Sequence, residues 1–253
     1  FTNLEMLHPA VSTRAVDGQW ESNDTIGISS TGMMDNMKFT RSGTSNQFVS
    51  ASTVWFKDKG VRSFSAYYPY NANPTNDLIM FQVPDSAIQS KQKVNDFLFA
   101  SGQASYAYPS LTLNFTHKMA RVFIKIYPSP EYGFTTNDFS GSILTFCDYF
   151  DSGTFNIKTG KVECSEESVS TGYFGEVKSS YMTFLLYVPA QTVPNIQLDL
   201  QNGEHYTFSI NDKWEAGHSY SYSLKPVRSK LQITSVSISS WESEQEQSIP
   251  GYI

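Results

Sequence analysis

The sequence is short of charged residues and of cysteine. Charged residues occupy only 17% of its 253 positions and the net charge is −6, so no basic surface is available to attract phosphates. Nucleic acid is therefore not expected as a partner. Only two cysteines are present, Cys147 and Cys164, and two do not make the disulfide framework of a small secreted domain. Two semi-buried thiols in strands and a single bridge are both compatible with this count.

Long apolar runs are also missing. The densest run, Phe184 to Val188, has the length of a strand, whereas a membrane-spanning helix needs about 20 apolar residues. The sequence starts at Phe1 and not at an initiator Met. This predicts that a signal or anchor segment has been removed from the chain or left out of it, which is compatible with export.

The usual catalytic and metal-binding motifs do not occur. There is no P-loop, no Rossmann glycine fingerprint and no GxSxG elbow. The four histidines, His8, His117, His205 and His218, lie far apart and form no HxH or HExxH pair. We therefore expect no catalytic residues, no cofactor and no metal site. An enzyme whose carboxylates converge only in the fold is the least favoured of three hypotheses for the function.

Aromatic residues, by contrast, are abundant. They make up 15% of the chain, with 18 Phe and 15 Tyr, and such residues favour strands. Short apolar stretches alternate with frequent turn residues, which is typical of a β-sandwich. A mixed polar and aromatic stretch ends at Pro109. We therefore predict an all-β protein with two domains, residues 1–109 and 110–253.

The segment around Asn202 and Gly203 allows a prediction of strand register. A two-residue loop would put the apolar residues of its two strands on opposite faces. A three-residue loop, Gln201 to Gly203, pairs Leu198 with Tyr206 and Ile196 with Phe208 on one face. It also places Gly203 at a left-handed position, which glycine adopts readily. The three-residue loop is the prediction.

A second hairpin is predicted around Thr159 and Gly160. A two-residue loop at these positions sets Ile157 opposite Val162 and Phe155 opposite Cys164. All four apolar side chains would then lie on one face of the hairpin.

The C-terminal stretch from Trp214 to Trp241 contains two strand patterns. Apolar residues alternate with serines from Tyr220 to Leu224, as in a half-buried antiparallel strand. In the second pattern the apolar positions slip by one residue between Ile233 and Val236. Because a slip of one residue would turn all later side chains to the other face, it predicts a β-bulge or a crossing between sheets.

The first segment has an edge character. Leu4, Met6 and His8 alternate loosely before Pro9. Proline cannot donate a backbone hydrogen bond, so it restricts this isolated strand to an edge or an end.

Five blocks of sequence, in this order and spread over nearly the whole chain, resemble the fimbrillin (Mfa-like, FimA-type) family of Bacteroidetes surface proteins, the subunits and accessory proteins of type V pili. The blocks are Ser12–Ala15 with Trp20 and Asp24–Ile28, Phe64–Tyr70, Asp96–Ala100, Leu113–Arg121, and the stretch from Trp214 to Trp241.

The resemblance implies a fold and an assembly mechanism. The family fold is two transthyretin-like β-sandwich domains in tandem, which agrees with the break at Pro109. Family members are exported as lipoproteins, so the resemblance implies a cell-surface, outer-membrane location and a membrane attachment only through a lipid anchor. A protease trims shaft subunits after an Arg that follows the first strand, and a strand from a neighbouring pilus subunit fills the open groove. Arg14 is the candidate protease-processing site, with Phe1 to Thr13 as the removable strand.

The subunit role and the ligand stay open. Twelve residues follow Trp241, and residues 242–248 are polar, so the tail has few apolar positions for a donor strand. This leaves tip, accessory, anchor and stand-alone adhesin roles beside that of a shaft subunit. A host or bacterial surface protein or glycan is the expected adhesion partner. The alternative function is a surface glycan-binding module that uses exposed Tyr and Trp side chains, with Tyr67, Tyr68, Tyr70, Tyr106 and Tyr108 as candidates.

Overall fold

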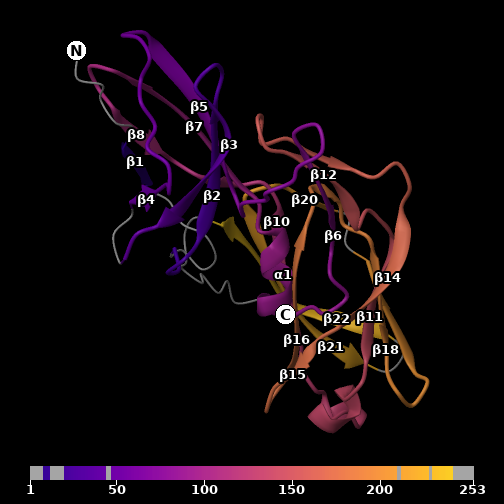
Figure 1. Ribbon diagram of the computed structural model, residues 1–253. Helices are drawn as coiled ribbons and strands as arrows, with labels where there is room; N and C mark the ends of the chain where they lie inside the picture. Colours follow the sequence, from indigo (N-terminus) through magenta and orange to yellow (C-terminus); the bar gives the residue numbers. More distant parts are fainter. Residues whose placement is uncertain (1–7, 12–19, 44–46, 210–211, 228–229, 242–253) are drawn as a thin grey trace. The chain divides into compact units, whose positions relative to one another are not determined.

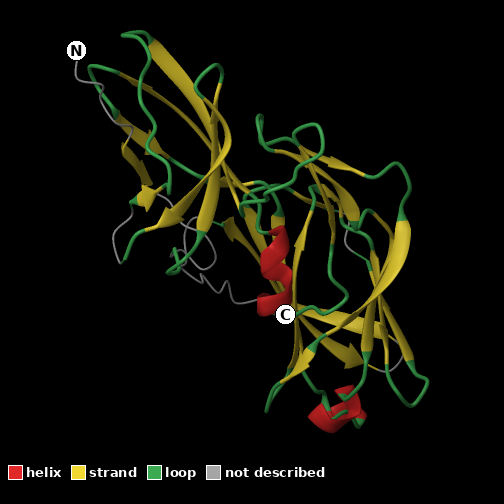
Figure 2. Cartoon of the chain, in the orientation of Figure 1, coloured by secondary structure: helices red, strands yellow, loops and turns green. Residues whose placement is uncertain are grey.

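The computed structural model describes residues 8–11, 20–43, 47–209, 212–227 and 230–241 (Figure 1). The all-β prediction is confirmed, since strands dominate these residues and helices are few and short (Figure 2). None of the helices in the described ranges is both long and apolar enough to cross a membrane.

The described residues form 22 strands and four short helices. The helices are α1 (Gln89–Gln92) and the 3₁₀ turns η1 (Lys93–Asn95), η2 (Pro130–Tyr132) and η3 (Thr136–Phe139). In chain order the strands are β1 (His8–Val11), β2 (Thr25–Ser30), β3 (Met34–Arg41), β4 (Phe48–Val49), β5 (Val61–Tyr68), β6 (Leu78–Gln82), β7 (Leu98–Ser105), β8 (Ser110–Leu113), β9 (Thr116–His117), β10 (Ala120–Ile126), β11 (Ile143–Tyr149), β12 (Ser152–Asn156), β13 (Val162–Cys164), β14 (Val169–Phe174), β15 (Glu176–Val177), β16 (Met182–Val188), β17 (Gln191–Thr192), β18 (Asn195–Asp199), β19 (His205–Phe208), β20 (Lys213–Trp214), β21 (His218–Val227) and β22 (Lys230–Ser240).

The chain forms two compact units that are not contiguous in sequence. Unit 1 comprises residues 1–80, 96–118 and 154–162, and unit 2 comprises residues 81–95, 119–153 and 163–253. The division into two domains, residues 1–109 and 110–253, stays a prediction.

Unit 1 contains a six-stranded sheet in the order β4-β3-β2-β5-β7-β9 and the two-stranded sheet β1-β8. Its core gathers side chains from both sheets. Ile28 and Ala66 come from the six-stranded sheet, Leu111 and Leu113 come from β8, and all four are almost completely buried. The alternation of apolar and polar residues along these strands decides which face points inward.

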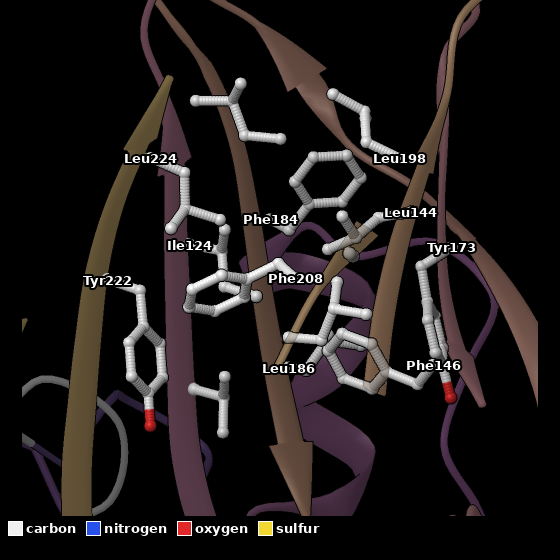
Figure 3. Close-up of a cluster of buried hydrophobic side chains, with 14 of the residues drawn as sticks. Ile124, Leu144, Phe146, Tyr173, Phe184, Leu186, Leu198, Phe208, Tyr222 and Leu224 are labelled. Atoms are coloured by element: carbon white, nitrogen blue, oxygen red, sulfur yellow. The ribbon is translucent and has the colours of Figure 1, made fainter. Parts of the chain in front are cut away.

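Unit 2 is a sandwich of a five-stranded sheet, β15-β16-β10-β21-β22, and a four-stranded sheet, β14-β11-β18-β19. Smaller sheets are β17-β20 in this unit and a three-stranded group ordered β13-β12-β6. The side chains of the two large sheets meet in one core, as Figure 3 shows. Ile124 and Phe184 project from the five-stranded sheet, and Leu144 and Leu198 project from the four-stranded sheet (Figure 3). Every one of these four side chains is fully buried.

The predicted register of the β18–β19 hairpin is confirmed. Ile196 pairs with Phe208 and Leu198 pairs with Tyr206. Gly203 has a φ of +88°, in the left-handed region that only glycine adopts at little cost. The pattern was sufficient here because only one register buries both apolar sets on the same face.

The predicted two-residue loop of the β12–β13 hairpin is wrong. The backbone N–H of Asn156 donates to the carbonyl of Lys161, so four residues separate the paired ends. The Asn156 side chain holds this wider turn by accepting hydrogen bonds from the N–H groups of Lys158 and Thr159, at 2.9 and 3.0 Å. Ile157 leaves the ladder and donates its N–H to the carbonyl of Asp77. A side chain and a distant carbonyl therefore set this turn.

The slip in the last strand is a β-bulge. Ser223 pairs with Ser235 and Leu224 pairs with Ile233, so Thr234 is the extra residue of β22. The Thr234 hydroxyl donates to the carbonyl of Ser223 at 3.0 Å, across the bulge. The first of the two alternatives that the sequence left open is confirmed.

Candidate strand-pairing site

The first described strand, β1, pairs with a single strand among the described residues. It pairs in parallel with β8, with His8 opposite Ser110 and Val11 opposite Leu113. β1 also lies beside β4, the edge strand of the six-stranded sheet. The sequence prediction of an isolated strand with an edge position therefore agrees with this pairing.

β8 is the strand that pairs with β1 at this site. Its side chains alternate, with Leu111 and Leu113 fully buried and Ser110 and Thr112 exposed. β7 approaches β8 closely at Gly102, where a Cβ atom would lie 2.8 Å from Leu111 Cδ1 and 2.8 Å from the carbonyl oxygen of Thr112. The buried leucines keep β8 attached to the core of unit 1.

Trp20 anchors the chain on the other side of residues 12–19. Its ring makes edge-to-face contacts with Phe48, Tyr68 and Phe115, at centroid distances of 5.0, 5.4 and 5.4 Å. The carbonyl of Trp20 accepts a hydrogen bond from the Arg41 guanidinium. Aromatic pairs of this geometry add about 0.5–1.5 kcal/mol each beyond the area they bury.

Asp24 reinforces this anchor. Its carboxylate accepts the backbone N–H of Glu21 at 2.7 Å and the Tyr68 hydroxyl at 3.2 Å. Burial, together with the nearby Asp24 carboxylate, raises the pKa of Tyr68, so the phenol stays protonated and donates. The chain that follows residue 19 is thus held by packing and by hydrogen bonds.

The two sides of residues 12–19 are held with different strength. β1 has four residues, and Pro9 has no backbone N–H to donate to β8. Each interstrand hydrogen bond contributes only about 1 kcal/mol net. Arg14, the candidate processing site, falls outside the described residues. The arrangement therefore places a weakly held strand before Arg14 and a firmly anchored tryptophan after it.

The aromatic residues considered for glycan stacking divide between the core and the surface. Tyr67 and Tyr68 are 1% and 4% exposed and cannot stack on a ligand. Tyr106 packs against the core of unit 1, whereas Tyr108 is 80% exposed. Tyr70 is half-buried, with Lys38 Nζ 5.7 Å from its ring centroid. Only Tyr108 is mostly exposed among these candidates, and a single ring does not make an aromatic platform for glycan binding.

Three of the four histidines, His117, His205 and His218, have separate partners. His117 Nδ1 lies 2.7 Å from Asp96 Oδ1 in the interior of unit 1, and His205 Nδ1 lies 2.5 Å from Asp199 Oδ1 at the surface of unit 2. His218 Nδ1 lies 3.2 Å from the carbonyl of Ala216. No group of three or more metal-ligating side chains occurs within the described ranges.

The two cysteines are free thiols of intermediate burial, and burial raises the pKa of the Cys164 thiol.

Sequence reasoning did not identify β8 as the partner of the first strand. The alternation of Leu111, Leu113 and Phe115 marked the buried face of that region. Nothing in the sequence marks a parallel partner about 100 residues away, because the pairing uses backbone groups that every residue carries.

Comparison with protein families gives a match over most of the chain. Residues 13–241 match the model of a family described as fimbrillin-like. The candidate fimbrium subunit Fim1C of Bacteroides uniformis is 24% identical over 249 residues, an alignment that covers 89% of this chain and 80% of that protein.

Solved structures share the fold. A candidate cell adhesion protein from Bacteroides uniformis superposes with a TM-score of 0.78 at 22% identity, covering 94% of this chain and 99% of that one. A candidate cell adhesion protein from Bacteroides ovatus gives 0.73 at 21% identity, with 96% and 100% covered. The tip fimbrial protein Mfa3 from Porphyromonas gingivalis, with a C-terminal truncation, gives 0.54 at 12% identity, with 94% and 100% covered. At these identities the likeness establishes a common fold.

Proposed function

The chain belongs to the fimbrillin-like family, and from that premise we propose that it is a fimbrial subunit assembled by strand exchange at β8. Proteolysis after Arg14 removes β1, and an extended strand from a neighbouring subunit takes its place.

The general function follows from the family. The protein is a fimbrial, cell-adhesion protein of the cell surface and not an enzyme. Its partners in this function are other pilus subunits. Attachment of its precursor to the outer membrane through a lipid anchor belongs to the proposal, as does the choice among tip, accessory and shaft roles.

The observation that carries the proposal is the pairing of β1 with β8 alone among the described strands. Removing β1 would uncover the backbone groups of β8 that now pair with it. Beside these groups lie Leu111 and Leu113, which are 0% exposed and belong to the core of unit 1. Unpaired backbone groups beside apolar side chains are the template that an added strand recognises.

An incoming strand can bind β8 more tightly than β1 does. It can extend beyond four residues, and it can carry a backbone N–H where β1 has Pro9. Each additional hydrogen bond is worth about 1 kcal/mol net, and alternate apolar side chains would pack on Leu111 and Leu113. Exchange is then favourable once the link between β1 and Trp20 is cut.

Treatment of the folded chain with an Arg-specific protease is expected to remove the segment that ends at Arg14. Arg41, Arg62 and Arg121 lie within paired strands and should resist cutting, because a protease needs locally unfolded backbone. Intact-mass measurement before and after treatment identifies the cut. Native gels and light scattering then report whether the trimmed chain forms polymers.

The Arg14→Ala chain is the matched control, and under the same treatment it should keep its N-terminal segment and form no polymers. Two results would contradict the proposal. One is cutting at other arginines while the bond after Arg14 stays intact. The other is a chain trimmed at Arg14 that releases β1 and forms no polymers at any concentration.

A further inference from the structure

β22 (Lys230–Ser240) is a long edge strand with few of the features that normally protect such an edge. Within the described part of unit 2 it stands at the end of the five-stranded sheet and pairs only with β21. It has 11 residues, and the ten from Leu231 to Ser240 include no charged residue and no proline. Lysine, proline or a very short length commonly prevents strand addition at an edge. The bulge at Thr234 is the one protective feature that β22 has.

An apolar row lies uncovered along this strand. Ile233, Val236 and Ile238 are 41%, 37% and 50% exposed. Their partners across the ladder are Leu224, Tyr222 and Tyr220, all buried in the core of unit 2 (Figure 3 shows Leu224 and Tyr222).

Residues directly opposite each other in an antiparallel pair project from the same face of the sheet. The three apolar residues therefore point toward the core side, yet they remain accessible. β19, the edge strand of the opposite sheet, approaches β22 but leaves these three residues partly uncovered, and we call this side of β22 its open face.

We propose that β22 pairs with β22 of a second copy of this chain, antiparallel and about a two-fold axis through Ser237. Val236 of each copy then lies opposite Ile238 of the other, on the open face of both sandwiches. Ser235 of each copy pairs with Ser239 of the other copy, and these serines project from the other face of the sheet. The inference concerns unit 2 alone and is independent of any cut at Arg14.

The apolar spacing selects this register. A two-fold axis perpendicular to the sheet keeps each side chain on its own face, so one residue must lie opposite itself. If that residue were Val236, Ile238 would face Thr234, and if it were Ile238, Val236 would face Ser240. Only the register centred on Ser237 covers both apolar residues with apolar partners. The bulge at Thr234 ends the regular stretch on one side.

Charge and hydrogen bonding also favour a second copy as the occupant. The contact segment is uncharged in both copies, so no ion is desolvated and no like charges meet. Both edges offer the same antiparallel set of backbone donors and acceptors, which match under the two-fold operation. Val236 and Ile238 of each copy would cover the same two residues of the other copy.

Cysteine cross-linking tests the register. A Ser237→Cys chain should form a disulfide-linked dimer under mild oxidation, since residue 237 lies opposite itself and Cα atoms opposite each other in a ladder are about 4.5–5.5 Å apart. Ser239→Cys is the matched control. In the proposed register its two copies are separated by four residue steps, about 13 Å, and should not cross-link. The parent chain shows the background from Cys147 and Cys164, measured on non-reducing gels.

Substitution of the apolar row tests the surface itself. Sedimentation velocity of the full chain at increasing concentration should show a monomer–dimer equilibrium, and Val236→Lys should shift it to monomer. Val177→Lys, at the other edge of the same sheet and 42% exposed, should leave the dimer intact. Equal cross-linking of the Ser237→Cys and Ser239→Cys chains would overturn the proposal. So would a parent chain that stays monomeric, or a dimer that survives Val236→Lys.

Discussion

Replacing Trp214 by alanine is expected to destabilise unit 2 by about 3–5 kcal/mol, the range for removing a fully buried aromatic side chain. Trp214 is 0% exposed, and its ring centroid lies 5.5 Å from that of Phe146. Its Nε1–H donates to the Tyr222 hydroxyl at 3.1 Å. The substitution therefore leaves a large cavity and removes the donor from a phenol whose pKa burial raises to about 12. Urea denaturation followed by far-UV circular dichroism measures the loss.

Trp55→Ala is the matched control for this experiment. Trp55 is 44% exposed, so its removal should change the free energy of unfolding by no more than about 0.5 kcal/mol. Trp214→Phe should fall between the two, because it keeps most of the packing and loses the hydrogen bond. A Trp214→Ala chain as stable as the Trp55→Ala chain would show that the core of unit 2 is not packed as described.

Replacing His117 by alanine is expected to cost unit 1 about 3–5 kcal/mol, as for a buried polar pair that loses one partner. Asp96 is 0% exposed, and its carboxylate lies 2.7 Å from Nδ1 of His117. Removing the ring takes away this hydrogen bond and leaves a cavity beside a carboxylate that water cannot reach. The midpoint of urea unfolding of the full chain should fall accordingly.

The surface pair of His205 and Asp199 provides a control with the same chemistry. Its Nδ1–Oδ1 distance is 2.5 Å, but the His205 side chain is 64% exposed. His205→Ala should therefore cost less than about 1 kcal/mol. If both histidine variants lost the same stability, burial would not be the cause of the effect at His117. Adding Asp96→Asn to the His117→Ala chain should recover part of the loss, because it removes the buried charge.

The accuracy of the register predictions followed the range of the interactions involved. In the β18–β19 hairpin, Leu198 and Tyr206 could meet on one face in one register only, so the sequence pattern was enough to predict the register. In the β12–β13 hairpin, the Asn156 side chain and the carbonyl of Asp77 fixed the turn. The hydrogen bond from Ile157 to Asp77, 80 positions away, leaves no local pattern, and the prediction failed there.

The candidate site was predictable only in part. The resemblance of the sequence blocks pointed to Arg14 and to a removable first strand. The partner of that strand, β8, could not be inferred, because a parallel pairing of four residues is made by backbone groups alone. The anchoring of Trp20 by Phe48, Tyr68 and Phe115 likewise joins residues that are far apart in the sequence.

The sequence by itself determined the all-β class and the face to which most strand residues turn, because aromatic content and alternation are local properties. It also indicated the family, through the five blocks that carry the resemblance. Only the tertiary structure decided which strands lie at an edge. The apolar residues Ile233, Val236 and Ile238 have the sequence pattern of a core strand, yet they are exposed. The physical reason is that side-chain alternation selects a buried face, whereas coverage of that face depends on how far the opposite sheet extends.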